Sequence, residues 1–435
     1  MSTDVAALPS RLESLLGSSR VTTTDLARWA IDEMAPRVVV RPGDAHQVGA
    51  VLRVCGELGA AVIPRGGGTA IEVGNVPRAA DVILLTDRLS DIVDYDHSNL
   101  TVTVQGGVPL EAVGETLAGQ RQFLPLDPPH AEAATVGGTA AVALNGPRRL
   151  LYGSVRDLVI GVRVARADGV NIRWGGKTVK NVAGYDMCKL FVGSLGTLGL
   201  LTELTLKVFP LPEASRTLVC RNSDLASILI LSARILASPL LPAAMTAVDA
   251  AVASALGPVL ADPPSPGLLV SLTGFDAAVA RHEGDITRWA NEAGMDVHTL
   301  GGDAEASAWR AVRNFGWDGE DAAIRLSTPH AATLTLHVEL RAVLPSSSGI
   351  VVHVGSGTVW IRLPRHELTP DLLASLRRLT KRHEGHLLTA RAPRAVKTVA
   401  DVWFPSPPAL PLMQGLKHAF DPRDVLNPGR FVSGL

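Results

Sequence analysis

The 435-residue sequence predicts an α+β protein with two domains. The chain is too long for one ordinary hydrophobic core, so two cores are expected. Its first part places short apolar segments around glycine-rich loops, whereas the part after Thr217 alternates strand-like and helix-like segments. We expect the two domains to meet at Pro210-Leu211-Pro212, where closely spaced prolines precede a polar stretch.

The first part is expected to consist mainly of short strands. Apolar runs and alternation predict strands at 37–42, 61–64, 81–85, 101–105, 159–165, 170–174 and 200–208. Helices are predicted at 44–58 and 110–117 from apolar residues at helical spacing. The prolines within 124–129 cannot extend a strand and are expected to stiffen an approach to the site.

The second part is expected to pack helices on an antiparallel or mixed sheet. Predicted strands are 217–220, 244–248, 267–273, 296–300, 322–326, 349–363 and 386–390, and predicted helices are 224–237, 276–293 and 371–384. The apolar segment 225–255 is interrupted by Arg234, Pro239 and Asp249, so it predicts a buried helix and a core strand and not a membrane span.

Charge and cysteine content exclude several function classes. With 41 Lys and Arg against 42 Asp and Glu, the chain has no electrostatic reason to bind nucleic acid or an anionic membrane. The three cysteines, Cys55, Cys188 and Cys220, form neither a zinc pattern nor a disulfide framework, and an iron–sulfur cluster needs about four. Residues 1–20 lack the order of a signal peptide, so we expect a cytoplasmic protein.

Two glycine-rich walls predict a dinucleotide site. Residues 64–70, Pro-Arg-Gly-Gly-Gly-Thr-Ala, follow an apolar strand, and their amides can surround a diphosphate without side-chain obstruction. Alone, such a loop is more often an ordinary tight turn. The small residues of 191–200 supply a second wall against which a flat ring system could lie, which favours a flavin over a nicotinamide. Arg65 either assists the phosphates or pairs with a local carboxylate.

Five motifs, in order, resemble the vanillyl-alcohol-oxidase or PCMH-type FAD-binding family. They are Arg65–Thr69, Thr135–Thr139, Tyr152–Asp157, Lys180–Asp186 and Asp421–Arg430. Within the family, the resemblance is greatest to FAD-binding subunits of glycolate oxidase. It implies an N-terminal helical segment (1–36), a two-lobed PCMH-type FAD-binding domain (37–212), a ferredoxin-like α/β cap domain (213–400) and a tail (401–435) that packs back on the FAD domain.

The resemblance also implies which residues contact FAD. Residues 64–70 would wrap the pyrophosphate, 135–138 would approach the flavin ring with 127–129 at the rim, and 194–200 would form the adenosine side. The implied residues are Pro64, Arg65, Gly66, Gly67, Gly68, Thr69, Ala70, Asp127, Pro128, Pro129, Thr135, Val136, Gly137, Gly138, Ala141, Asn145, Ser194, Gly196, Thr197, Gly199, Leu200 and Asn427.

Two departures from the family pattern bear on chemistry. Thr69 stands where several relatives carry a histidine bonded to FAD, and no cysteine lies between 127 and 145, so noncovalent FAD is expected. The stretch 353–360 resembles one whose histidines help bind a metal in related hydroxy-acid dehydrogenases, but Trp360 replaces the second histidine. Because a single imidazole is a poor divalent-metal site, no metal is expected.

Oxidation of a 2-hydroxy acid needs a base for the hydroxyl and a cation for the carboxylate. His353 could be the base, with Arg362 or Arg391 as the anion clamp; otherwise His353 is a strand histidine satisfied by backbone. His383 and His386 have the wrong spacing for a zinc-binding helix and receive no site.

The sequence therefore predicts a noncovalent FAD-binding subunit of a glycolate or 2-hydroxy-acid oxidase complex. A sister FAD subunit and an iron–sulfur subunit would be its partners, and attachment to the inner membrane would come only through them. Two alternatives stay open: a self-sufficient FAD-dependent oxidoreductase of a hydroxy acid or alcohol, and a flavin-free scaffold subunit.

Overall fold

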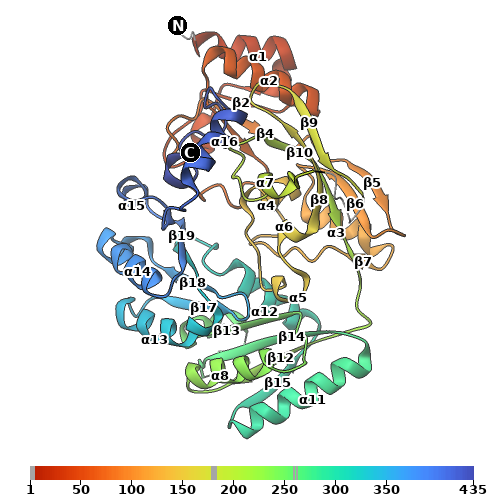
Figure 1. Cartoon of the computed structure of the whole chain (residues 1–435), viewed down its shortest axis with the longest axis vertical. Coiled ribbons are helices and arrows are strands. Elements are labelled where there is room, and N and C mark those ends of the chain that lie inside the picture. The colour runs from red at the N-terminus through yellow and green to blue at the C-terminus, as the bar shows by residue number, and fades with distance from the viewer. Residues whose placement is uncertain (1–4, 178–183, 258–259, 261–262) are drawn as a thin grey trace.

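A computed structural model describes residues 5–177, 184–257, 260 and 263–435 (Figure 1). Of the Lys180–Asp186 motif, residues 180–183 lie outside this described part. The chain forms three main sheets, two in its first part and a larger one after Pro212. No helix in the described ranges has the length and apolar character needed to cross a bilayer.

The N-terminal lobe is a four-stranded sheet covered by two helices. In spatial order, its strands are β1 (Val21–Thr22), β2 (Val38–Val40), β4 (Val82–Leu85) and β3 (Val62–Arg65). Helices α1 (Leu8–Leu16) and α2 (Ala45–Leu58) close its core, as Figure 1 shows. Asp44 caps α2 by accepting from Gln47 N at 2.8 Å, and Gly59 ends it with φ +66°. Strand β3 leads directly into the glycine loop.

The second lobe is a five-stranded antiparallel sheet. Its strands, in spatial order, are β5 (Ile92–Asp96), β6 (Thr101–Gln105), β10 (Leu200–Lys207), β8 (Val159–Ala165) and β9 (Asn171–Gly175). Its helices are α3 (Leu110–Ala118), α4 (Val136–Val142), α5 (Arg149–Tyr152), α6 (Val155–Leu158) and α7 (Cys188–Phe191). Strand β5 and helix α4 were not predicted, because β5 is only partly buried and α4 is a short, glycine-containing helix.

A nine-stranded antiparallel sheet forms the cap. In spatial order, its strands are β15 (Asp296–Leu300), β12 (Ala214–Arg221), β14 (Gly267–Gly274), β13 (Ala244–Val248), β17 (Gly349–His353), β18 (Thr358–Leu363), β16 (Ala322–Ser327), β19 (His386–Arg391) and β20 (Trp403–Phe404). A separate two-stranded sheet, β7 (Gln122–Phe123) and β11 (Phe209–Pro210), precedes it in the chain. The predicted long strand at 349–363 is a hairpin, because Gly355 and Gly357 turn the chain with φ +86° and +62°. The antiparallel arrangement is one of the two options that the alternation predicted.

Helices cover the two faces of the cap sheet unequally. The face away from the first domain packs on α8 (Leu225–Leu236), α11 (Asp276–Glu292), α13 (Thr333–Val343) and α14 (Pro370–Arg382). The opposite face shares a core with α9 (Ala250–Ala253), α12 (Gly302–Asn314) and apolar residues of the first domain, including Val73 and Leu195. The segment 225–255 is thus a buried helix followed by a core strand, as predicted.

The C-terminal tail returns to the first domain, as the sequence predicted. After α15 (Arg394–Val399) and α16 (Leu410–Phe420), Leu426 pairs in parallel with Val62 of β3. Val62 N donates to Val425 O at 2.7 Å, and Asn427 N donates to Val62 O at 3.0 Å. In Figure 1, α16 lies beside the N-terminal lobe and far from most of the cap. The tail therefore lies next to the strand that carries the glycine loop.

Candidate functional site

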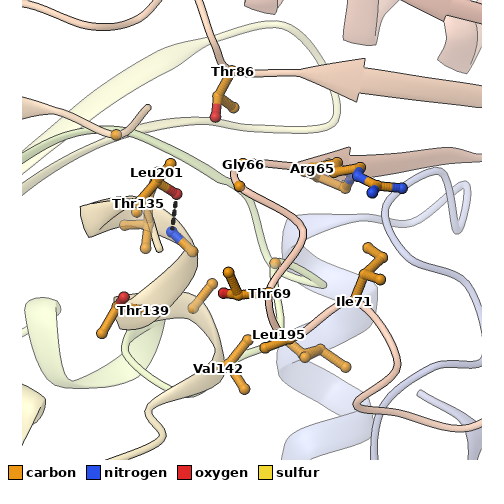
Figure 2. Close-up of a pocket in the computed structure, with 18 of the residues that line it drawn as sticks. Arg65, Gly66, Thr69, Ile71, Thr86, Thr135, Thr139, Val142, Leu195 and Leu201 are labelled. Carbon is orange, nitrogen blue, oxygen red and sulfur yellow. Dashed lines mark hydrogen bonds between the residues drawn. The ribbon is translucent and has the colours of Figure 1, made fainter. Parts of the chain in front are cut away.

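A cleft of about 950 Å³ opens between the glycine loop, helix α4 and the start of β10 (Figure 2). Its lining residues are Pro64, Arg65, Gly66, Gly67, Gly68, Thr69, Ala70, Ile71, Thr86, Gly106, Pro128, Pro129, Thr135, Gly137, Gly138, Thr139, Ala141, Val142, Leu144, Leu195, Gly196, Gly199, Leu200, Leu201, Asn427 and Arg430. The structure thus brings together all of the predicted 64–70 loop, much of both other walls and the predicted Asn427.

The glycine loop is packed too closely to carry side chains. A Cβ on Gly66 would lie 2.2 Å from Thr135 Oγ1, and one on Gly67 would lie 1.8 Å from Ala133 O. Gly68 adopts φ +76°, a conformation that glycine adopts readily. In the described part of the chain, no N–H of residues 66–70 donates to a main-chain carbonyl. Successive unpaired N–H groups form a concave anion site, and a diphosphate matches it.

The wall formed by residues 135–142 places α4 directly on the end of β6. Gly137 N donates to Gly106 O at 2.8 Å, and a Cβ on Gly137 would come within 2.6 Å of the same oxygen. Thr135 caps the helix by accepting from Gly138 N at 3.2 Å. Figure 2 shows Thr135, Thr139 and Val142 along α4, with Val142 next to Leu195. Close backbone packing therefore opens a flat-sided space with little side-chain bulk.

Four polar atoms around this cleft are buried without a partner in the described part of the chain. They are Thr86 Oγ1, Thr139 Oγ1, Asn427 Oδ1 and Arg430 Nε. The Asn427 amide is fixed at its other end, because Nδ2 donates to Leu195 O at 2.6 Å. Buried polar atoms normally have hydrogen-bond partners, so such a cluster indicates a ligand with several donors and acceptors. FAD offers phosphate oxygens, ribityl hydroxyls and ring atoms, and the residues present fit it.

Of the two arginines that line the cleft, Arg430 is buried and Arg65 is half-buried. The guanidinium of Arg65 lies over the Trp29 ring, 5.1 Å from its centroid, and burial lowers its pKa. Neither alternative from the sequence anticipated this stacking contact. Arg430 Nη2 donates to Val73 O at 2.8 Å and to Ile71 O. Burial lowers the pKa of Arg430 to about 10, although the charge of Asp32 acts in the opposite direction.

Five predicted FAD contacts do not line the cleft, because they hold the walls in place. Asp127 accepts from Arg148 N at 3.0 Å, and burial raises its pKa to about 6. Val136 is fully buried in the core of the second lobe. Asn145 connects Ala143 O and Val155 N at 3.0 and 2.8 Å. Thr197 Oγ1 donates to Ser194 O at 2.7 Å, so these last two predicted residues bond to each other.

Several lining residues were missed from the sequence: Ile71, Thr86, Gly106, Thr139, Val142, Leu144, Leu195, Leu201 and Arg430. Thr86 directly follows β4, which pairs in parallel with β3, so it lies at the same sheet edge as the glycine loop. Thr139 and Val142 share one face of α4, which could be found only once α4 was recognised as a helix.

None of the three predicted catalytic residues lines the cleft. His353 is buried in β17, its Nδ1 lies 3.1 Å from Thr246 Oγ1, and burial lowers its pKa to about 4. Its partner is thus a neighbouring side chain and not the backbone that the alternative named. Arg362 Nε lies 3.6 Å from Asp321 Oδ2. Arg391 is buried and donates to Gly316 O, Gly319 O and Glu72.

The described histidines and acids outside the cleft do not form a metal site. His383 Nε2 lies 3.0 Å from Glu339 Oε2, and within the described ranges no group of three or more His, Cys, Asp or Glu is placed to hold a metal ion. The three cysteines are buried, and burial raises their pKa values to about 12, 11 and 12 for Cys55, Cys188 and Cys220. Thiolate chemistry is disfavoured by such shifts.

Comparison with known proteins agrees with this geometry. Residues 36–175 match the family described as "FAD binding domain", and residues 403–431 match "FAD linked oxidases, C-terminal domain". The chain therefore contains an FAD-binding domain similar to that of FAD-linked oxidases. FAD is its cofactor, and the matched segments contain the glycine loop, α4 and the returning tail.

Curated relatives of this flavoprotein match it partly or at low identity. It is 36% identical to glycolate oxidase subunit GlcD of Bacillus subtilis over 49% of this chain and 46% of the relative. It is 49% identical to glycolate oxidase subunit GlcE of Escherichia coli over 29% of this chain and 37% of the relative. These matches span less than half of those relatives. The D-2-hydroxyglutarate dehydrogenase of Xanthomonas citri matches over 93% of this chain and 90% of its own length, at 27% identity.

Solved structures share the fold across nearly the whole chain. p-Cresol methylhydroxylase with substrate bound superposes with a TM-score of 0.74, at 16% identity, over 98% of this chain and 96% of its own. Alkyldihydroxyacetonephosphate synthase does so with a TM-score of 0.74, at 17% identity, over 97% and 84%. At these identities the likeness shows the fold, an α+β protein whose FAD-binding domain is followed by a cap.

Proposed function

We propose that the chain binds FAD noncovalently and acts as one flavin subunit of a glycolate or other 2-hydroxy-acid oxidase complex. Within such a complex it would correspond to the E component and pass electrons toward an iron–sulfur partner. The observation that carries the proposal is the cleft itself, in which residues 66–70 present unpaired main-chain N–H groups beside four unpartnered polar atoms. The partial matches to two glycolate oxidase subunits support the choice of complex.

Different residues at the cleft would bind different parts of FAD. The N–H groups of 66–70 would hold the diphosphate, because they supply donors with no competing main-chain acceptor. The 135–142 and 195–201 walls would enclose the remainder, since their glycines leave room for flat groups. Bound FAD would supply the redox chemistry. Thr69 at the loop supports noncovalent attachment, because its hydroxyl lacks the nucleophilicity of an imidazole or thiolate.

The position of His353 supports a helper role for this chain. A base for a hydroxy acid must reach the substrate hydroxyl, yet His353 is buried in β17 against Thr246 and lies outside the cleft lining. Arg362 and Arg391 are likewise held by Asp321 and by Glu72 with Gly316 O and Gly319 O. We therefore assign substrate oxidation to the sister flavin subunit.

A self-sufficient oxidoreductase is the second candidate. The observation that favours it is the match to D-2-hydroxyglutarate dehydrogenase, which extends over 93% of this chain. Under this alternative, the chain alone would transfer electrons from a hydroxy acid to its flavin.

One experiment separates the candidates. The purified chain is examined for flavin absorbance, precipitated with acid to test release of the flavin, and mixed anaerobically with glycolate or D-lactate. We expect released FAD and no bleaching of the flavin until partner subunits are added. Bleaching by the chain alone would favour the second candidate, and a chain that cannot take up FAD would leave only the scaffold role.

A further inference from the structure

A second cavity lies between the FAD-binding domain and the cap. Its volume is about 210 Å³, which leaves room for a small molecule. Its lining residues are Phe123, Asp127, Pro147, Arg148, Tyr152, Leu211, Pro212, Ser215, Ala243, Ala244, Ser271, Thr273, Glu305, Trp309 and Arg313. Asp127 immediately precedes Pro128 and Pro129 of the FAD cleft, so the two spaces adjoin through one rigid proline segment.

Two guanidinium groups face this cavity from opposite domains. Arg148 comes from the turn before α5 and lies at the exposed rim, whereas Arg313 comes from α12 and is half-buried. In the described part of the chain, neither is among the ion pairs, and Arg313 Nε is buried without a hydrogen-bond partner. Burial lowers the pKa of Arg313, and the nearby charge of Asp127 acts in the opposite direction. The cavity therefore has more hydrogen-bond donors than its own residues use.

The acids in the cavity wall are already occupied. Asp127 is buried and accepts from Arg148 N at 3.0 Å. Glu305 Oε1 accepts from Thr217 Oγ1 at 2.7 Å. Burial raises the pKa of Asp127, and the charges of Arg148 and Arg313 both act in the opposite direction. In the described part of the chain neither guanidinium group is within ion-pair distance of a carboxylate, so both have donors open to an incoming anion.

Helix α12 fixes the direction of Arg313. Glu305, Trp309 and Arg313 are spaced four residues apart and share one face of the helix. Glu305 and Trp309 both bond to Thr217 Oγ1, with Trp309 Nε1 at 2.9 Å, which anchors that face on β12. Arg313 is the member of this row that has no such bond in the described structure, and it lines the cavity.

We propose that this interdomain cavity binds a small carboxylate, held by Arg148 of the FAD-binding domain and Arg313 of the cap. Guanidinium groups match carboxylates in geometry, and hydroxyls of Ser215, Ser271 and the Tyr152–Thr273 pair complete a polar wall. The carboxylate comes either from a hydroxy acid that the complex oxidises or from a carboxylate that does not react. Because the site spans both domains, its occupation would hold the cap against the FAD-binding domain.

The test is calorimetric titration of the FAD-loaded chain with glycolate, with malonate as a carboxylate that lacks an oxidisable hydroxyl, and with chloride. We expect both carboxylates to bind, and each of Arg148→Gln and Arg313→Gln to weaken binding about 10- to 100-fold, as loss of a charge-assisted hydrogen bond implies. Arg310→Gln is the matched control, because Arg310 lies on α12 outside the cavity lining. Glycolate binding without malonate binding would identify the source as the oxidised substrate.

Unchanged carboxylate binding in the Arg148→Gln, Arg313→Gln double variant would overturn the proposal, as would absence of binding to the wild-type chain or equal heats with chloride. Flavin content and melting temperature of each variant are measured alongside. Both should match the wild type, since neither arginine lines the FAD cleft. The carboxylate site can therefore fail while FAD binding stands.

Discussion

The glycine loop at residues 66–70 and the segment 71–75 that follows it are adjacent in sequence and opposite in character. The loop's N–H groups donate to no main-chain carbonyl in the described structure. In the next segment, Arg430 binds the carbonyls of Ile71 and Val73, and Lys397 Nζ donates to Glu72 O at 2.7 Å. The N–H groups of an anion site can thus stay unpaired when the chain segment immediately after them is held by other residues.

The contacts behind the loop come from three parts of the chain. Arg365 and Arg391 of the cap both bind the Glu72 carboxylate, and Lys397 forms a buried ion pair with Asp32 at 2.8 Å. Arg430 comes from the returning tail. Cap, tail and N-terminal lobe therefore meet at the segment that positions the glycine loop. We expect substitutions in the loop, or in the residues that hold this segment, to lower the affinity for FAD.

The largest effect on FAD affinity is expected from Gly67→Ala, which changes the open glycine loop. The added Cβ would lie 1.8 Å from Ala133 O, so the loop must move away from the segment that precedes α4. We expect FAD affinity to fall about 5- to 150-fold, since such backbone clashes cost roughly 1–3 kcal/mol. Flavin absorbance per chain measures it. Gly114→Ala in α3 is the matched control, because nothing lies within 4 Å of its Cβ and flavin content should not change.

The largest effect on the stability of the fold is expected from Lys397→Met, which removes a cation from the closed side. The substitution leaves the buried carboxylate of Asp32 without its cation, and breaking a buried pair in this way costs about 3–5 kcal/mol. Urea unfolding should show this loss, together with a lower flavin content. Adding Asp32→Asn should restore part of the stability; if it restores none, the charge of Asp32 is not the cause.

The stability of the fold should depend on pH through His353, which is buried in β17 and already bonded to Thr246, unlike the unpaired N–H groups of the glycine loop. The folded state lowers the pKa of His353 to about 4, so between pH 4 and 6.5 the unfolded chain binds more protons. Stability from this group is complete above pH 6.5 and decreases by about 3 kcal/mol as the pH falls to 4. Relative to the wild type, His353→Phe should flatten the pH profile of unfolding in this window. An unchanged profile would contradict the buried neutral imidazole.

The smallest effect is expected from Arg365→Gln, at the rim of the closed side. Arg365 is partly exposed, its pair with Glu72 is screened by solvent, and Arg391 still binds the same carboxylate. We expect no more than about 1 kcal/mol of stability loss and less than about a fivefold change in FAD affinity. A titration with FAD after removal of the cofactor measures the change. A larger effect would mean that the partly exposed pair of Arg365 and Glu72 contributes more to holding the loop than the buried contact of Arg391.

Local pattern predicted much of the fold. Strands such as 101–105 and 244–248 and helix 44–58 were predicted because apolar spacing and caps act within a few residues. Helices α12 and α13 were missed, as was the hairpin at 349–363. Short connections and partial burial weaken the local signal there, and contacts with the cap sheet stabilise these elements.

The loop and walls of the FAD cleft could be predicted from the glycine positions and the family resemblance. These follow from chain geometry, since glycine permits close backbone approach wherever it stands. Three features depend on tertiary packing: Thr86 and Arg430 join the cleft, His353 is buried away from it, and Arg148 and Arg313 face one cavity. Each of these depends on contacts between residues far apart in the chain, which local pattern does not encode.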